Sequence, residues 1–288
     1  MLNILVADGN DRSGRADHVA ATGQTSAEAY ATILRTLAEA QGGPSCTCTL
    51  VSPADADTAL PPGHDLSAYA GLVVTGSALK IGDGAPEVTR QIALMRAALA
   101  AGLPVFGSCW GMQVAAVACG GTAGPNPKGG EYGFARGLAA TEAGARHPLL
   151  AGRPARFDAP AVHGDAVLTL PDHAELLADN ACSIQAIVIG HGPGTFWGTQ
   201  YHPELDLDVL AAMLRTSASD VVDSGQCADE AAVESFAADL ARLHADGTGH
   251  PDLLARHGID AQIVDDANRR REIGNFLARL AVPRAVAA

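Results

Sequence analysis

The chain has 288 residues, which corresponds to one large domain or to one domain with an appendage. Hydrophobic residues make up 48% of the sequence and charged residues 18%, so the chain can bury a sizeable core and is too apolar to be disordered. The formal net charge of −13 argues against a nucleic-acid partner and favours a protein with a small-molecule substrate.

The N-terminal run Met-Leu-Asn-Ile-Leu-Val-Ala lacks a basic segment and predicts a buried strand rather than a signal peptide. No apolar run reaches the ~20 residues that a transmembrane helix needs. We therefore expect a cytoplasmic protein with no membrane partner. The 6 cysteines show no disulfide-scaffold spacing. Cys46 and Cys48 are expected on one face of a strand rather than at a metal or redox site.

Short apolar segments alternate with segments of helical periodicity in the first part of the chain. Ser26 predicts a helix start, and Pro86 suits the first turn of a second helix. This alternation predicts a parallel sheet with helices on both faces, in which ligands bind at the carboxyl ends of the strands. Strands are expected at 2–7, 46–51, 71–75 and 103–107, and helices at 26–40 and 86–101.

The polar segment between the first strand and the first helix, residues 8–18, is expected to be a loop at the rim of the sheet. Its acidic spacing faintly resembles a calcium loop, but it lacks the terminal glutamate that would bind the ion through both oxygens. We therefore expect no metal there, and a lid or a docking surface is the role that its position favours.

The middle and the end of the chain differ from this pattern. Residues 120–165 are rich in Gly and Pro and predict loops and short antiparallel strands. Residues 217–229 are expected to be a linker, so we divide the chain into a domain at 1–215 and a helical C-terminal extension at 216–288. Further strands are expected at 166–170, 184–189 and 195–200, and further helices at 205–216, 229–244 and 262–281.

The segment Leu-Pro-Val-Phe-Gly-Ser-Cys-Trp-Gly-Met-Gln, residues 103–113, carries the first chemical signal. A buried strand leads through a glycine-flanked turn into an apolar helix, which is the arrangement of a nucleophile elbow with Cys109 in the place of serine. The helix N-terminus would stabilise a thiolate, and the amide of Trp110 would point to a developing oxyanion. A merely buried cysteine is the alternative, which we accept for Cys119, Cys182 and Cys227.

A cysteine nucleophile needs a general base, and the base needs an orienting partner. The segment Phe-Trp-Gly-Thr-Gln-Tyr-His-Pro-Glu, residues 196–204, supplies both. A strand ends at Tyr201, so His202 would lie at the same edge of the sheet as Cys109, and Glu204 follows after a rigid proline. The carboxylate can hold one imidazole nitrogen and leave the other facing the thiol, which predicts a Cys109–His202–Glu204 triad.

These two motifs resemble those of the class I (triad) glutamine amidotransferases, and in particular free-standing proteins similar to the amidotransferase half of GMP synthetase. The resemblance covers roughly residues 1–215. Further segments between and beside the two motifs match the family pattern: Thr-Gly-Ser at 75–77, Gly-Gly-Glu-Tyr-Gly at 129–133, His-Pro-Leu-Leu at 147–150, His-Gly-Asp-Ala-Val at 163–167 and Ser-Ile-Gln-Ala at 183–186.

The resemblance implies a flavodoxin-like α/β domain and a ping-pong reaction that uses no cofactor. Cys109 would attack the side-chain amide of glutamine, and His202 would protonate the departing ammonia. Water would then hydrolyse the γ-glutamyl thioester. The resemblance also implies that backbone N–H groups of Gly76 or Ser77 and of Trp110 hold the oxyanion.

Two positions add detail to the resemblance. Gln113 matches a family position that helps to shape the glutamine pocket. Gly76-Ser77 departs from the Gly-Gly that is frequent in the family's oxyanion loop, so the amides are retained while the local backbone is free to differ.

Three functions remain open from the sequence. The first is a glutaminase that supplies ammonia to a separate ATP-dependent synthetase subunit, since the chain has no Walker-type phosphate loop. The second is a stand-alone hydrolase or transferase that acts on γ-glutamyl amides or peptides. The third is a non-catalytic protein that retains the fold, which the intact triad disfavours. We expect the first function and keep the second as the alternative.

An apolar stripe lies near the end of the chain, where Ile273, Phe276, Leu277 and Leu280 fall at helical spacing. We expect this stripe to pack on its own domain. A homodimer or partner interface is the alternative.

Overall fold

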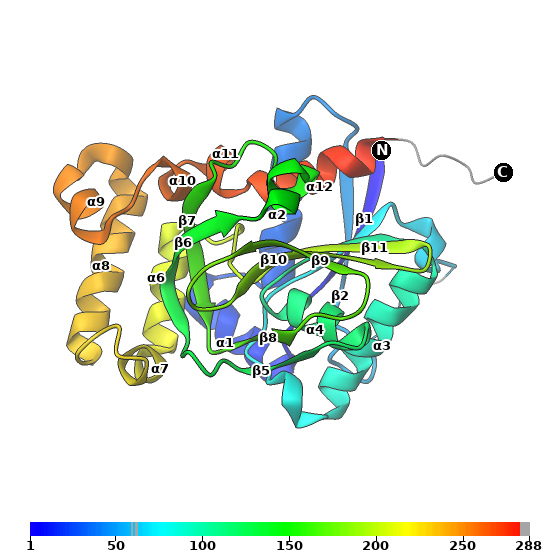
Figure 1. Ribbon diagram of the computed structural model, residues 1–288, viewed down its shortest axis with the longest axis horizontal. Coiled ribbons are helices and arrows are strands. Elements are labelled where there is room, and N and C mark those ends of the chain that lie inside the picture. The colour runs from blue at the N-terminus through cyan, green and yellow to red at the C-terminus, as the bar shows by residue number, and fades with distance from the viewer. Residues whose placement is uncertain (59, 61–62, 283–288) are drawn as a thin grey trace.

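A nine-stranded mixed sheet forms the centre of the protein (Figure 1). The structure is a computed structural model that describes residues 1–58, 60 and 63–282. The strands are β1 (Leu2–Ala7), β2 (Cys46–Val51), β3 (Gly71–Val74), β4 (Pro104–Ser108), β5 (Thr122–Pro125), β6 (Glu131–Ala140), β7 (Arg156–His163), β8 (Asp165–Thr169), β9 (Ala174–Asp179), β10 (Ile184–His191) and β11 (Gly194–Thr199). Their order in the sheet is β2-β1-β3-β4-β11-β10-β9-β6-β7, and β5 pairs with β8 separately. The strands from β2 to β11 in this order are parallel, whereas β10, β9, β6 and β7 pair antiparallel.

Helices cover both faces of the sheet, which confirms the predicted fold class (Figure 1). One face carries α2 (Ser26–Ala40) and α12 (Arg271–Ala281), and the other carries α3 (Pro86–Ala100) and α4 (Trp110–Ala118). The remaining helices are α1 (Arg12–Thr22), α5 (Glu142–Arg146), α6 (Leu207–Thr216), α7 (Ala218–Asp223), α8 (Glu230–Asp246), α9 (Pro251–His257), α10 (Ala261–Val264) and α11 (Asp266–Arg269).

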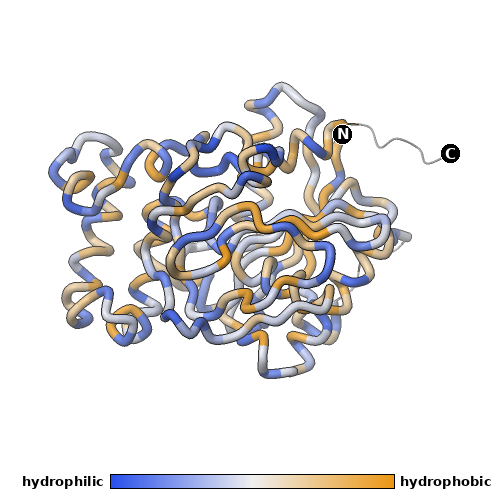
Figure 2. Tube along the Cα trace, viewed as in Figure 1, coloured by the Kyte–Doolittle hydropathy of each residue, from blue (hydrophilic) through white to orange (hydrophobic). Residues whose placement is uncertain are grey.

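Alternate side chains of the parallel strands enter two separate cores. Ile4 and Val6 of β1 join the core under α2 and α12, whereas Leu5 and Ala7 join the core under α3 and α4. Figure 2 shows the corresponding pattern, in which apolar segments run through the interior strands. The parallel strands are thus buried on both faces, and their carboxyl ends form the edge that is open to ligands.

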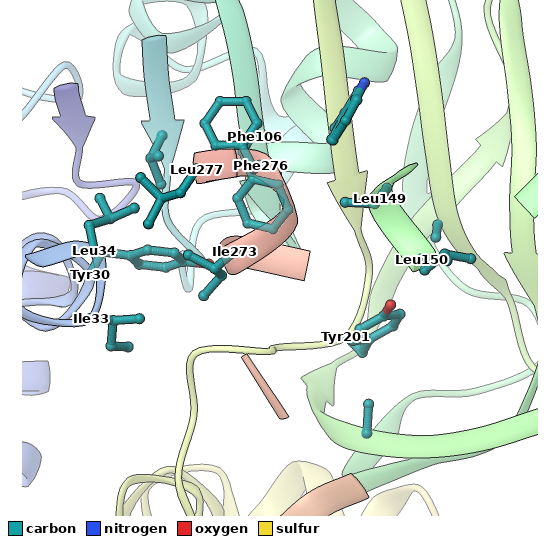
Figure 3. Packing of buried hydrophobic residues seen from close by; sticks show 14 of the residues in the cluster. Tyr30, Ile33, Leu34, Phe106, Leu149, Leu150, Tyr201, Ile273, Phe276 and Leu277 are labelled. Carbon is teal, nitrogen blue, oxygen red and sulfur yellow. The ribbon is translucent and has the colours of Figure 1, made fainter. Parts of the chain in front are cut away.

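The apolar stripe of α12 packs on the chain's own sheet, as we expected. Ile273, Phe276 and Leu277 are buried in the same core as Phe106, and the rings of Phe106 and Phe276 have centroids 5.6 Å apart (Figure 3). Leu280 is partly buried against this core. The stripe is therefore covered within the protein itself.

A third core joins α6 to the helices that follow it. Leu210 and Leu214 of α6 pack with Leu240 and Leu243 of α8 and with Ile263 of α10. In Figure 1, α8 and α9 form the left end of the molecule, and the chain returns from there through α10 and α11 to α12. The division of the chain at residue 216 stays a prediction.

Two segments that we expected to be irregular contain helices. The predicted loop at 8–18 is wrong, because α1 starts there: Asp11 caps it by accepting from the Gly14 N–H, and Gly23, with φ 82°, ends it. None of the residues of α1 is buried, so it carries no apolar periodicity that could have revealed it. The predicted linker at 217–229 contains α7.

The helix predicted at 262–281 is divided into α10, α11 and α12. Asp260 and Asp265 each cap a new helix with their side chains, so the chain changes direction within the predicted segment. The middle of the chain does form antiparallel strands, but β6 has 10 residues and β7 has 8, so they are longer than predicted. No helix in the described part of the chain is long and apolar enough to cross a bilayer.

Candidate active site

Cys109 stands in a sharp turn between β4 and α4. Its backbone has φ 49° and ψ −102°, which is strained for a residue with a side chain. A Cβ at Gly107 would lie 2.9 Å from the backbone of Gly111, and a Cβ at Gly111 would lie 2.7 Å from the carbonyl oxygen of Val74. Glycine at both positions therefore lets the strand, the turn and the helix approach closely, as the predicted elbow requires.

The sulfur of Cys109 is buried at the N-terminal end of α4. The residue is 5% exposed, and the first N–H groups of the helix have no partners inside it. Gln200, which follows β11, donates from Nε2 to the Cys109 Sγ at 3.4 Å. The backbone N–H of Cys109 donates to the carbonyl oxygen of Thr199 at 2.7 Å, which ties the elbow to β11.

His202 and Glu204 lie at the same edge of the sheet as Cys109, because β4 and β11 are adjacent and parallel. His202 Nδ1 and Glu204 Oε1 are 2.6 Å apart, and both side chains are buried. His202 Nε2 is buried and makes no hydrogen bond of ordinary geometry to any described residue, although the Cys109 sulfur is close enough to affect the charge of the ring. Nε2 is therefore the ring nitrogen that the surrounding described residues leave unpaired.

The Glu204 carboxylate is also held by two hydroxyl groups that the sequence did not connect with the site. Ser108 Oγ donates to Oε1 at 2.9 Å, and the Tyr30 hydroxyl donates to Oε2 at 2.9 Å. The two hydroxyl oxygens are 2.6 Å apart. Tyr30 comes from α2, far from Glu204 along the chain, so only the fold reveals its role.

Burial and charge act in opposite directions on this pair. Burial lowers the pKa of His202, but Glu204 and the Cys109 sulfur outweigh it and raise that pKa well above 6.5. Burial raises the pKa of Glu204, but His202 and the Tyr30 hydroxyl lower it below 4.5. Burial and the Glu204 charge raise the pKa of Tyr30 well above 10.0, so its phenol stays protonated and donates. The site favours an imidazolium held by an ionised carboxylate.

The loop after β3 lies against the imidazole of His202. A Cβ at Gly76 would lie 2.9 Å from His202 Cε1, so a side chain there would displace the ring. The backbone N–H groups of Gly76 and Ser77 donate to no other residue in the described chain. A Cβ at Gly9 would lie 2.7 Å from both the Gly76 oxygen and Trp110 Cδ1. Gly76 therefore lies beside His202, and Gly76 and Trp110 both lie against Gly9.

The predicted pocket residue Gln113 lies one helical turn after Cys109 and is 3% exposed. Its Nε2 donates to the backbone carbonyl of Asp165 at 3.0 Å, which places it between the nucleophile and the 163–167 segment. His163 Nε2 lies 3.1 Å from Glu131 Oε2. Hydrogen-bond contacts therefore join three segments that matched the family pattern in the sequence, at 107–113, 129–133 and 163–167.

The polar segment after β1 borders the same site, in agreement with its predicted rim position. Burial lowers the pKa of His18 in α1, while the Asp8 and Glu204 carboxylates oppose this shift. Asn10 Oδ1 accepts from the Ala78 N–H at 3.1 Å, which ties the segment to the loop after β3. Among residues 1–58, 60 and 63–282, no group of three or more His, Cys, Asp or Glu side chains is arranged to hold a metal ion.

Comparison with known proteins agrees with this geometry. The profile of the family "Glutamine amidotransferase class-I" matches residues 27–219. The chain is 35% identical over 292 residues to a γ-glutamyl-L-1-hydroxyisopropylamide hydrolase from a Pseudomonas species, which covers 99% of this chain and 95% of the relative. It is 36% identical over 183 residues to the glutamine-hydrolysing GMP synthase of Thermomicrobium roseum, which covers 62% of this chain and 32% of the synthase. The chain therefore spans about a third of that synthase.

Solved structures share the fold at low sequence identity. A glutamine amidotransferase from Thermotoga maritima superposes with a TM-score of 0.65 at 13% identity, covering 98% of this chain and 100% of that protein. A glutamine amidotransferase from Methylobacillus flagellatus superposes with a TM-score of 0.58 at 18% identity, covering 99% of this chain and 97% of that protein. The family profile and the near full-length relative show that the chain belongs to the class I glutamine amidotransferase family.

Proposed function

We propose that this protein hydrolyses γ-glutamyl amides of small amines, with Cys109 as nucleophile, His202 as acid and base, and Glu204 as its orienting partner. The observation that carries the proposal is the 2.6 Å contact of His202 Nδ1 with Glu204, which leaves Nε2 for the reaction beside Cys109. The substrate class is taken from the Pseudomonas hydrolase, which is 35% identical over 99% of this chain.

The reaction starts from a thiolate–imidazolium pair. The Cys109 sulfur attacks the γ-carbonyl carbon, and the electron pair of the C=O bond moves to the oxygen. When this oxyanion collapses, the C–N bond breaks and His202 Nε2 gives its proton to the departing amine. Water then attacks the thioester and gives one proton to His202, glutamate leaves, and the thiolate is restored.

The oxyanion of each step needs donors that are in place before the reaction. In the proposed mechanism these are the N–H groups of Gly76 or Ser77 in the loop after β3 and of Trp110 at the start of α4. Losing one such donor typically slows an enzyme ~10²–10³-fold. Because the loop packs directly on His202, the acid–base group and the oxyanion donors share one rigid frame.

A second candidate is a glutaminase that supplies ammonia to a separate synthetase subunit. Its support is the match to GMP synthase, which is 36% identical over 62% of this chain. A glutamine-hydrolysing GMP synthase subunit from Methanospirillum hungatei is 35% identical over 42% of this chain and 61% of its own length. These matches cover less of this chain than the hydrolase does, so we place this function second, although the sequence alone placed it first.

The test is to incubate the purified protein with L-glutamine, with γ-glutamyl-isopropylamide and with the α-glutamyl isomer of that amide. We expect faster release of amine from the γ-glutamyl amide than of ammonia from glutamine, and no release from the α-isomer. A γ-glutamyl adduct on the Cys109 peptide should appear in acid-quenched samples. Cys109→Ala should remove the adduct and lower turnover by about 10⁴-fold or more.

The two candidates predict different outcomes. Hydrolysis of glutamine alone, stimulated by a co-purifying ATP-dependent ligase, would support the glutaminase and overturn the first proposal. Full activity of Cys109→Ala would overturn the nucleophile assignment for both candidates.

A further inference from the structure

A backbone carbonyl fixes the orientation of the amide side chains beside the nucleophile. The carbonyl oxygen of Asp165 lies 3.0 Å from Gln113 Nε2 and 3.1 Å from His163 Nδ1. A carbonyl can only accept hydrogen bonds, so both nitrogens must be donors. The amide of Gln113 therefore has its nitrogen toward Asp165, with no freedom to exchange nitrogen and oxygen.

The orientation of Gln113 in turn fixes the orientation of the Gln200 amide. Gln113 Nε2 also lies 3.5 Å from Gln200 Oε1, which accepts its second hydrogen at the long end of hydrogen-bond range. With its oxygen engaged there, Gln200 presents Nε2 to Cys109 Sγ at 3.4 Å. Gln113 is 3% exposed and Gln200 is 0% exposed, so water does not compete for either amide.

A buried His163–Glu131 contact lies at the far end of this chain of contacts. His163 Nε2 lies 3.1 Å from Glu131 Oε2, so each ring nitrogen lies within hydrogen-bond distance of an oxygen. Burial raises the pKa of Glu131, but His163, Asn180 and Gln185 outweigh it and lower that pKa, which keeps the carboxylate ionised. His163 and Gln113 thus both donate to the Asp165 carbonyl, and from Gln113 the donors continue through Gln200 to the sulfur.

We propose that Gln200 is a further catalytic residue, whose amide N–H stabilises the Cys109 thiolate and fixes the sulfur for attack. The Asp165 carbonyl and Gln113 act through it as positioning groups. This inference rests on the proposed role of Cys109 as the nucleophile. A thiolate accepts a hydrogen bond far better than a neutral thiol does, so an aimed N–H favours the charged form.

The titratable groups around the sulfur are His202 and Glu204, which follow β11, and Tyr30 of α2. Gln200 differs from them because it carries no charge at any pH. Its contribution to the thiolate does not vary with pH, so its removal acts mainly at the pH where thiol and thiolate coexist and much less where the sulfur is fully ionised.

Alkylation of Cys109 by iodoacetamide tests this inference without any substrate. The rate is followed on the Cys109 peptide by mass spectrometry across a range of pH. In Gln200→Leu we expect alkylation at neutral pH to slow about tenfold, since a hydrogen bond to a charged group is lost, and to match the wild type at alkaline pH. Gln200→Glu keeps the shape of the side chain but replaces the donor, and we expect a larger loss at neutral pH.

Gln41→Leu is the matched control, because it removes a glutamine amide bond to the Gly274 carbonyl, far from the sulfur. Its alkylation profile should equal that of the wild type. Near-UV circular dichroism identifies any variant that fails to fold, and Gln200→Glu then serves in place of Gln200→Leu.

A pH profile for both Gln200 variants that equals the wild type would overturn the inference. An equal slowing at every pH would also overturn it, because it would mean that Gln200 controls only access to the sulfur. If the wild type hydrolyses no γ-glutamyl amide but the alkylation profiles shift as expected, the proposed substrate fails and the role of Gln200 stands.

Discussion

Two consecutive residues, Tyr201 and His202, each contact a buried glutamate, and the two contacts have different consequences. Tyr201 donates to Glu272 Oε1 at 3.0 Å, and the Arg153 guanidinium donates to both oxygens of that carboxylate at 2.7 and 2.8 Å. Every nitrogen of Arg153 has an acceptor, including Gln262 and the carbonyl of Arg269. The Glu272 cluster is therefore satisfied and ties α12 to the loop before β7.

In the Glu204 cluster, both carboxylate oxygens have hydrogen-bond partners, but one nitrogen of the His202 imidazole has none among the described residues. Glu204 accepts from Ser108 and Tyr30 and holds His202 Nδ1, while Nε2 makes no hydrogen bond to the described residues. Buried polar atoms normally have partners, so the unpaired nitrogen beside the strained Cys109 sets this cluster apart from the Glu272 cluster. One polar cluster is thus fully paired, and the other keeps an unpaired imidazole nitrogen, which is the nitrogen that the proposed function uses.

The largest expected effect is on turnover, from His202→Asn. Asparagine retains a polar group near Glu204 but cannot carry a proton between thiol and amine, so we expect kcat to fall about 10⁴-fold. The imidazolium no longer balances the Glu204 charge, so some stability is lost, but the asparagine amide and the Ser108 and Tyr30 hydroxyls can still donate to the carboxylate and limit the loss. Steady-state kinetics measures kcat, and calorimetry measures the stability of the same sample. A large loss of stability would contradict the proposed difference between the two clusters.

The Glu272 cluster should show the reverse pattern. Glu272→Gln leaves the charge of Arg153 buried without its counter-ion, and we expect the free energy of unfolding to fall by about 3–5 kcal/mol. Turnover below the unfolding temperature should stay near that of the wild type. Denaturant titration measures the loss, and the double variant Arg153→Met/Glu272→Leu, which removes both charges, should recover most of it. A double variant as unstable as the single one would show that the charge is not the cause.

Tyr30→Phe tests the role of the hydroxyl groups that donate to Glu204, and we expect a mild effect. Tyr30→Phe removes a donor to Glu204, so the pKa of Glu204 rises toward its ordinary value. A carboxylate with a lowered pKa stabilises the fold above its unfolded pKa, and this contribution is lost as the pH falls through the folded pKa. We expect kcat/KM to fall about tenfold on the acidic side and little at neutral pH.

A pH–rate profile and acid unfolding measure the two consequences of Tyr30→Phe. Tyr69→Phe is the control, since that hydroxyl lies 3.3 Å from His64 Nδ1 and away from the triad. If the acidic side of the pH–rate profile does not shift in Tyr30→Phe, then Ser108 and His202 alone keep Glu204 ionised.

The sequence predicted the parts of the site that are encoded locally. The elbow around Cys109 and the His202-Pro-Glu204 turn are contiguous motifs, and the parallel strands that carry them are short apolar runs. Tyr30 and Gln200 were not assigned roles, because their partners lie 174 and 91 residues away in the chain. Pairings at such separations follow from the strand order and not from any local pattern.

The missed elements of the fold have a related cause. No residue of α1 is buried, and β9 alternates polar with apolar residues only weakly, so neither produced a strong periodic signal. The breaks that divide α10, α11 and α12 depend on aspartate caps, which are visible in the sequence but too common to assign without the fold.

The positive φ of Cys109 has a consequence for any attempt to make this protein more robust. Only glycine adopts that conformation without strain, so the backbone turn that carries Cys109 is held there at the expense of folding free energy. A selection for heat resistance alone would therefore reward replacement of Cys109 by glycine. Improvement of this protein has to be screened by turnover, because thermal selection alone would favour replacement of the proposed nucleophile.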